Sequence, residues 1–219
     1  MNFIDRTSLG YTLARRFKQF RGKDAVILCL QESSLMTCLT MAVHLHAWVY
    51  PLLYVPVYEP DGMHDLLGAF DQDGEFCPVP NSAATISKSP REMVAILHKQ
   101  RPTAMKSLHA QKTSYGLPLN KSLLDGRDVL LVGDVITMPL PLIVAHELLK
   151  DVTPKSLTAV AGNATPEVAQ LVRMSAGDTE ILDILSGVVF DENHYFERAD
   201  EYTPKQKHEL TENIATYWQ

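Results

Sequence analysis

Short unbroken apolar runs alternate along this chain with segments in which apolar residues recur at helical spacing. Five of the runs have the length of a strand, and they cover residues 25–30, 52–58, 129–132, 156–161 and 180–185. Runs without polar alternation are typical of strands that are covered on both faces, as in parallel sheets. Strands that alternate with helices favour an α/β architecture with helices on both faces of the sheet. The pattern therefore predicts one α/β domain over residues 1–219, with a Rossmann-like, mainly parallel sheet.

The segments between these runs carry helix start signals. The helices expected in and around the sheet cover residues 8–20, about 35–47, 142–150 and 165–174. Ser33 or Ser34 is placed to cap the second of these helices. A capping box at residues 89–92 includes a proline at the first helical position and predicts another helix. The same pattern at residues 203–206 predicts a C-terminal helix over about 204–218.

Two regions depart from the strand–helix rhythm. The region from about residue 59 to about residue 88 contains two short apolar runs joined by the turn 71–74. This pattern predicts an inserted β-hairpin, or hood. Pro56 inside the run 52–58 indicates an edge strand or a bulge. Pro102 should kink or end its helix, and the polar stretch of about 105–124 predicts a flexible loop.

Charge and cysteine usage narrow the class of protein. The chain has 20 Lys and Arg against 26 Asp and Glu, a net charge of −6. Such a chain lacks the positive field on which general nucleic-acid binding depends, so we expect no nucleic-acid partner. The three cysteines form no C-x-x-C pair, which favours buried free thiols over disulfides or a zinc site. Residues 33–58 contain no charged residue, but six Ser, Thr and His residues and two prolines indicate a buried helix and strand rather than a membrane span. We therefore expect a cytoplasmic protein.

The first candidate chemistry follows the strand at 129–132. In an open parallel sheet, ligands bind beyond the carboxyl ends of the strands. The stretch Val129-Leu130-Leu131-Val132-Gly133-Asp134-Val135-Ile136-Thr137 resembles the phosphoribosyl-pyrophosphate motif of type I phosphoribosyltransferases. Residues 6–30, the hairpin at 68–79 and the segment 190–218 also resemble bacterial proteins of that family. The resemblance implies the type I phosphoribosyltransferase fold with a hood, a phosphorylated ligand, Mg²⁺ only if transferase activity is retained, and a possible homodimer.

The chain departs from the family pattern in both phosphate-binding loops. In the family, paired acids hold the ribose hydroxyls, whereas here Gly133 takes the first position and leaves Asp134 alone. The loop that wraps the 5′-phosphate is rich in glycine in the family, whereas residues 138–141 here read Met-Pro-Leu-Pro, and prolines donate no N–H. The loop that contacts pyrophosphate reads Gln31-Glu32-Ser33-Ser34 and places a carboxylate where a diphosphate would lie.

Each candidate residue also has a structural interpretation. Asp134 is either a ligand for ribose or a solvated strand-end acid, with little effect on stability when changed to Asn. Thr137 is more typical of a helix cap than of a phosphate contact, and Ser33 and Ser34 are more typical of caps than of nucleophiles. His44 and His46 are two residues apart and would face different ways on a helix. Tyr195 and Phe196 either cover a base or anchor the tail.

The sequence leads to two hypotheses of different classes. In the first, the protein is a degenerate phosphoribosyltransferase homologue that binds a nucleotide, a sugar phosphate or a protein partner. In the second, it is an active phosphoribosyltransferase with an atypical phosphate loop. The ligand-binding residues, if the site is retained, are those after the strand, namely Asp134, Val135, Ile136, Thr137 and Met138. Those at the pyrophosphate-loop position are Gln31, Glu32, Ser33 and Ser34.

Overall fold

The computed structural model describes residues 3–60, 65–80, 83–115, 119–186 and 191–198, together with residues 203, 205, 206 and 209. Five parallel strands form the core sheet, in the order β2-β1-β6-β7-β8. Their bounds are Val26–Cys29 for β1, Trp48–Pro51 for β2, Asp128–Ile136 for β6, Ser156–Ala164 for β7 and Asp178–Ile184 for β8. The expected α/β fold with a mainly parallel sheet is confirmed.

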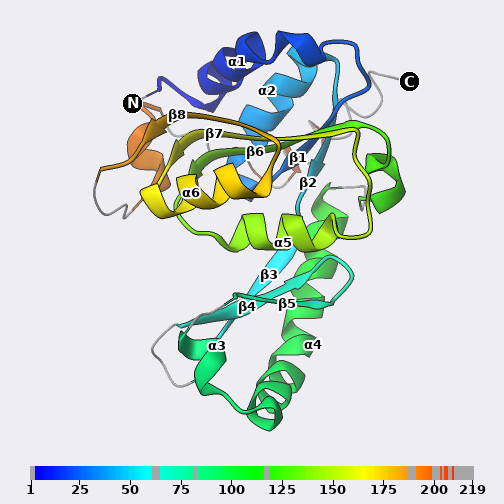
Figure 1. Ribbon diagram of the computed structural model, residues 1–219, viewed down its shortest axis with the longest axis vertical. Coiled ribbons are helices and arrows are strands. Elements are labelled where there is room, and N and C mark those ends of the chain that lie inside the picture. Colours follow the sequence, from blue (N-terminus) through cyan, green and yellow to red (C-terminus); the bar gives the residue numbers. More distant parts are fainter. Residues whose placement is uncertain are drawn as a thin grey trace.

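Helices cover both faces of this sheet (Figure 1). Helices α1 (Arg6–Arg16) and α2 (Leu35–Leu45) lie on one face, and α5 (Leu140–Leu148) and α6 (Pro166–Ser175) lie on the other. Side chains of β1 alternate between the two layers: Ile27 packs with the α1 and α2 side, and Leu28 packs with the opposite side. This double burial explains why the strand is an unbroken apolar run.

The second sheet is antiparallel, in the order β3-β4-β5, and projects from the core as the hood (Figure 1). Its strands are β3 (Tyr54–Tyr58), β4 (Leu66–Asp71) and β5 (Phe76–Pro78). The expected hairpin is therefore confirmed as β4 and β5. Strand β3 is an edge strand with a register shift at Val57/Tyr58, as the proline predicted.

The run 52–58 does not join the core sheet, and this expectation is wrong. The strand that pairs with β1 is Trp48–Pro51, with Trp48 opposite Val26. His46 ends α2 in the left-handed conformation at φ 56°, which turns the chain into β2 two residues later. The run 52–58 then crosses from the core into the hood.

The hood also contains α3 (Ala83–Ser87) and a long helix, α4 (Pro90–Tyr115). Helix α4 begins with the expected capping box, in which Ser89 and Glu92 exchange hydrogen bonds. It continues through Pro102 to Tyr115, so the expected end there is wrong, and the loop expected over about 105–124 is wrong for residues 105–115. Residues 116–118 of that expected loop lie outside the described residues. The buried residues Ala104 and Leu108 hold the second half of the helix on the core, and Gln100 donates to the carbonyl of Tyr58 at 2.7 Å. This packing outweighs the one intrahelical bond that a proline removes.

The remaining local predictions divide. Cys29, Cys38 and Cys77 are free and buried, as expected. Thr165 caps α6 as predicted. The hydrogen bonds of the last capping box, between Thr203 and Gln206, are formed. Most of the C-terminal helix expected over about 204–218 lies outside the described residues. No helix within the described ranges is long and apolar enough to cross a membrane.

Candidate functional site

The motif strand β6 runs through the residues that were expected to follow it. Asp134 lies inside this strand, two residues past its last pair with β1 but within the part that runs beside β7, and its side chain is 0% exposed. The expectation of a solvated acid at a strand end is therefore wrong. Nearly all buried carboxylates are paired or hydrogen-bonded, because an unpaired buried charge is costly.

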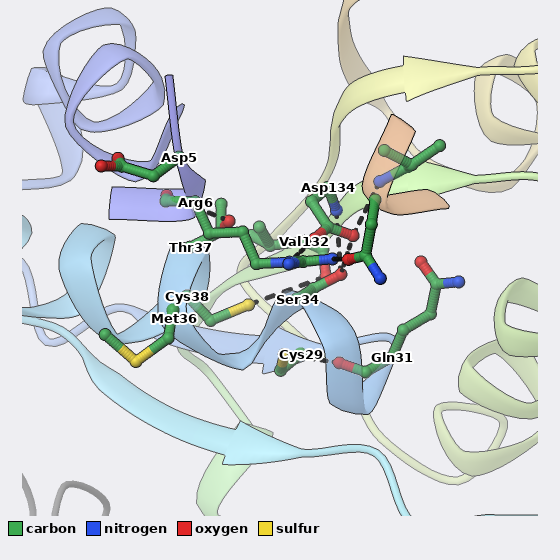
Figure 2. Close-up of polar contacts among 12 residues, drawn as sticks. Asp5, Arg6, Cys29, Gln31, Ser34, Met36, Thr37, Cys38, Val132 and Asp134 are labelled. Carbon is green, nitrogen blue, oxygen red and sulfur yellow. Dashed lines mark hydrogen bonds and ion pairs between the residues drawn. The ribbon is translucent and has the colours of Figure 1, made fainter. Parts of the chain in front are cut away.

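The partner of Asp134 is Arg6, the first residue of α1. The Nε atom of Arg6 lies 2.6 Å from Oδ2 of Asp134, and both side chains are buried (Figure 2). Asp5 begins this helix with a capping box, in which its Oδ1 accepts from the backbone N–H of Ser8 at 2.7 Å. The cap fixes the start of α1 and so places Arg6 above the motif strand.

Ser34 satisfies the other oxygen of the carboxylate. Its Oγ donates to Oδ1 of Asp134 at 2.7 Å and accepts from the backbone N–H of Asp134 at 2.9 Å. The N–H of Val135 also donates to Oδ1, at 2.7 Å. Ser34 stands at the N-cap of α2 but makes no capping bond, so its expected side-chain cap is wrong. The hydroxyl instead joins two segments that are 100 residues apart.

The C-terminal segment covers the other side of Arg6. Nη2 of Arg6 donates to Oδ1 of Asn193 at 2.9 Å, and its guanidinium lies 4.5 Å from the ring centre of Phe196. Phe196 is buried and pairs with Phe3 in an isolated parallel bridge. The aromatic pair at 195–196 therefore anchors the tail, with Tyr195 packed against the same core cluster.

Gly133, at the first acid position of the motif, has no room for a side chain. A Cβ atom there would lie 2.6 Å from Cγ1 of Ile136 and 2.7 Å from its Cδ1. Ile136 is itself buried. An aspartate at position 133 therefore requires that Ile136 move or be replaced.

The loop after β6 offers few donors to a phosphate. Pro139 occupies the N-cap of α5, so the cap expected at Thr137 is wrong. The N–H groups of Leu142 and Ile143 both donate to the carbonyl of Pro139 at 3.1 Å. Pro139 and Pro141 have no N–H. Met138 is 47% exposed on this loop, and its side chain carries no donor for a phosphate.

The pyrophosphate-loop position faces a cavity of about 210 Å³ between the core and the hood. Glu32, Gln111 and Tyr115 are its polar lining residues. The rest of its lining is apolar or aromatic, namely Pro51, Leu52, Leu53, Tyr54 and Pro56. Burial raises the pKa of the Tyr115 hydroxyl, and the negative charge of Glu32, whose carboxylate is hydrogen-bonded to this hydroxyl, raises it further. The lining holds a carboxylate and no lysine or arginine.

The structure thus separates the predicted residues into two places. Ser34, Asp134 and Val135 lie together in the buried network, while Glu32 lines the cavity, and Gln31 lies beside the network in Figure 2. Thr137 and Met138 belong to neither. The carboxylate of Asp134 is a poor ligand for Mg²⁺, because three donors already engage its two oxygens. Among the described residues no group of three or more His, Cys, Asp and Glu side chains is arranged to hold a metal ion.

Sequence reasoning missed Arg6, Asn193, Gln111 and Tyr115. Only Arg6 carried a local signal: a cation in the first turn of a helix opposes the helix dipole and indicates a specific partner. Asn193 lies 187 residues from Arg6, and α4 was not expected to reach Gln111 or Tyr115.

Comparison with known proteins identifies the fold. No protein-family model and no curated protein matches the chain. The crystal structure of TT1426 from Thermus thermophilus is similar at 20% identity and a TM-score of 0.77, covering 96% of this chain and 98% of that one. A hypoxanthine phosphoribosyltransferase from Staphylococcus aureus is similar at 12% identity and a TM-score of 0.44, over 82% of this chain and 72% of that one. An APRTase from Giardia lamblia is similar at 10% identity and a TM-score of 0.46, over 83% and 80%. The α/β fold with its parallel core sheet is therefore shared with TT1426 over nearly the whole of both chains.

Proposed function

We propose that this protein has lost phosphoribosyl transfer and binds a small nucleoside-like ligand in the cavity between core and hood. The observation that carries the proposal is the state of Asp134, whose carboxylate is held by Arg6, Ser34 and the backbone N–H of Val135. By family resemblance, this acid would hold ribose hydroxyls. Here a hydroxyl would have to displace a buried ion pair, and breaking such a pair costs about 3–5 kcal/mol.

The phosphate loop supports the same conclusion. Catalysis of this kind depends on preorganised donors, and removing one donor from an oxyanion-type site costs on the order of 10²–10³ in rate. Pro139 and Pro141 supply no donor, and the N–H groups of Leu142 and Ile143 are used in the first turn of α5. Glu32 adds a negative charge beside the position of the pyrophosphate.

The cavity at Glu32 suits the base of a nucleotide-like ligand rather than its phosphate. Its lining combines flat apolar surfaces with two acceptors, the carboxylate of Glu32 and the amide oxygen of Gln111. Oε1 of Gln111 is buried and accepts no hydrogen bond from the described residues. A buried acceptor of this kind favours a ligand with N–H donors. A heterocyclic base has such donors on a flat apolar body, and the absence of lysine and arginine from the lining disfavours a phosphate.

The activity half of the proposal is tested by pyrophosphate release. Wild-type protein with phosphoribosyl pyrophosphate, Mg²⁺ and a panel of purine and pyrimidine bases should release no pyrophosphate above background. The variant Gly133→Asp/Ile136→Ala/Pro139→Gly/Pro141→Thr serves for comparison, because the change at Ile136 makes room for the aspartate. Steady turnover by the wild type would establish the alternative, an active transferase with an atypical loop.

The binding half is tested by calorimetry with bases and nucleosides. Gln111→Leu should weaken binding at least about tenfold, since it removes a buried acceptor. Glu32→Gln should also weaken binding, since it removes the negative charge that strengthens a hydrogen bond from an N–H donor. The exposed amide of Gln170 on α6 gives the matched control, and Gln170→Leu should leave the affinity unchanged. If no base or nucleoside binds the wild type, or if the three variants bind equally, the cavity is not the ligand site.

A further inference from the structure

A second concave site lies on the outer surface of the core, away from the hood. A groove of about 200 Å³ is formed where the C-terminal ends of α1 and α2 come together. Ala14 and Leu45 are buried residues of its lining. Tyr11, Arg15, Lys18, Arg21 and His44 complete the lining. The groove therefore combines three permanent cations, an imidazole and a phenol on one small surface.

The positive charge in this groove is not neutralised within the described part of the chain. Arg15, Lys18 and Arg21 are exposed and form no ion pair with any described carboxylate. The lining contains no Asp or Glu. The groove is therefore locally positive on a chain whose net charge is −6.

Basic residues near helix C-termini also have a purely structural role, which accounts for only part of this charge. Each helix end carries a partial charge of about −0.5, and two helices end here. Together they offset about one of the three cations. The remaining positive charge of about two cations is available to bind an anion.

Part of the groove is held in place before any ligand binds. The guanidinium of Arg15 lies 5.9 Å from the ring centre of Tyr11, and Tyr11 packs edge-on against His44 with ring centres 5.0 Å apart. Arg21 approaches His46, with 3.5 Å between Nη2 and Nε2. Side chains that are already ordered lose less conformational entropy when they bind.

We infer that this groove binds a compact phosphate polyanion, such as the di- or triphosphate chain of a small molecule. Arginine guanidinium groups match phosphate oxygens with paired N–H donors, and lysine adds a third charge. The volume equals that of about seven water molecules, which suits a short phosphate chain rather than an extended polymer. The site is independent of the core–hood cavity, whose lining is acidic.

The test uses inorganic tripolyphosphate and the full chain. Isothermal titration at low salt should give one saturable site that weakens as the ionic strength rises, since salt screens exposed charges. The variant Arg15→Gln/Lys18→Gln/Arg21→Gln should lose at least about tenfold in affinity, because charge-assisted bonds supply most of the binding. Arg16→Gln removes a neighbouring cation of α1 that pairs with Glu180 and does not line the groove, so its affinity should stay close to that of the wild type.

Three results would overturn the inference. The first is no saturable binding by the wild type, and the second is unchanged binding by the triple variant. The third is tighter binding of a single-stranded oligonucleotide than of tripolyphosphate, lost in the triple variant, which would make this face a nucleic-acid surface. Because the three side chains are exposed, urea unfolding of the triple variant should stay cooperative, with a midpoint only slightly below that of the wild type from the lost charges at the helix ends.

Discussion

The guanidinium of Arg6 and the carboxylate of Asp134 form a buried ion pair, 2.6 Å from Nε to Oδ2, that joins helix α1 to the motif strand β6. The pair spans 128 residues of sequence. Ser34 and Asn193 extend it on either side, so the start, the middle and the end of the chain meet at one buried network.

Changing Asp134 to Asn should lower the free energy of unfolding by about 3 kcal/mol, because Arg6 would keep a buried charge without its partner. Urea denaturation measures the change. Asp151→Asn is the control, since Asp151 is exposed, and it should stay within about 0.5 kcal/mol of the wild type. A double-mutant cycle with Arg6→Met should show strong coupling, and simple additivity would mean that the two side chains do not form the pair.

Gly10 is needed where α1 crosses α2. A Cβ there would lie 2.6 Å from the carbonyl oxygen of Thr37 and 2.7 Å from Cβ of Thr40. Gly10→Ala should therefore destabilise the protein by about 1–3 kcal/mol, although alanine is the better helix former. Gly177→Ala provides the comparison, because its nearest atom would be 3.8 Å away. Thermal unfolding of both variants checks this, and equal melting temperatures would contradict the close approach.

The hydrogen bond between Ser156 and Asp128 should make the free energy of unfolding depend on pH. The hydroxyl of Ser156 donates to Oδ1 of Asp128 at 2.6 Å, and this bond, with Lys155, lowers the pKa of the carboxyl in the folded protein. A lowered pKa contributes stability that is full above the unfolded value of about 3.9 and is lost as the pH falls through the folded value. Ser156→Ala should thus cost about 1–2 kcal/mol at pH 7 and less at about pH 3.5. The exposed Ser186 supplies a control, since Ser186→Ala should show the same small difference at both pH values.

Cys77 should resist alkylation in the folded protein. Burial, with Asp71 nearby, raises the pKa of its thiol to about 12. At pH 8 only about one thiol in 10⁴ is then ionised, and the thiolate is the reactive form. Mass spectrometry after iodoacetamide treatment should find Cys77 unmodified in buffer and modified in urea. Labelling in buffer at the rate of a free thiol would show that the hood opens.

The core could be predicted from sequence because its signals are local. The run at 25–30 and the capping sequence at Thr165 each contain the information that determines their structure. Pro102 misled because a proline inside a helix costs a fixed amount, whereas the packing of Ala104 and Leu108 that compensates it depends on distant segments. The run 52–58 misled because an apolar strand in the hood looks the same as one in the core.

The site was harder to predict than the fold. The motif pointed correctly to the strand that carries Asp134, but no pattern in the sequence connects residue 134 to residue 6 or residue 34. Whether an acid faces solvent or an arginine is decided by contacts between segments far apart in the sequence. The clash of Ile136 with any side chain at Gly133 is equally invisible until the strand is built.

Helix α4 connects the cavity with the outer part of the hood. Tyr115 at one end contacts Glu32 of the core, and α4 extends from there far out into the hood (Figure 1). With 26 residues the helix is about 39 Å long, so a tilt of about 5° at Tyr115 displaces the far end by about 3 Å. A ligand that intervenes between Tyr115 and Glu32 would thereby convert a small local rearrangement into a movement of the whole hood, measurable as a changed distance between spin labels at Val94 and Asp151.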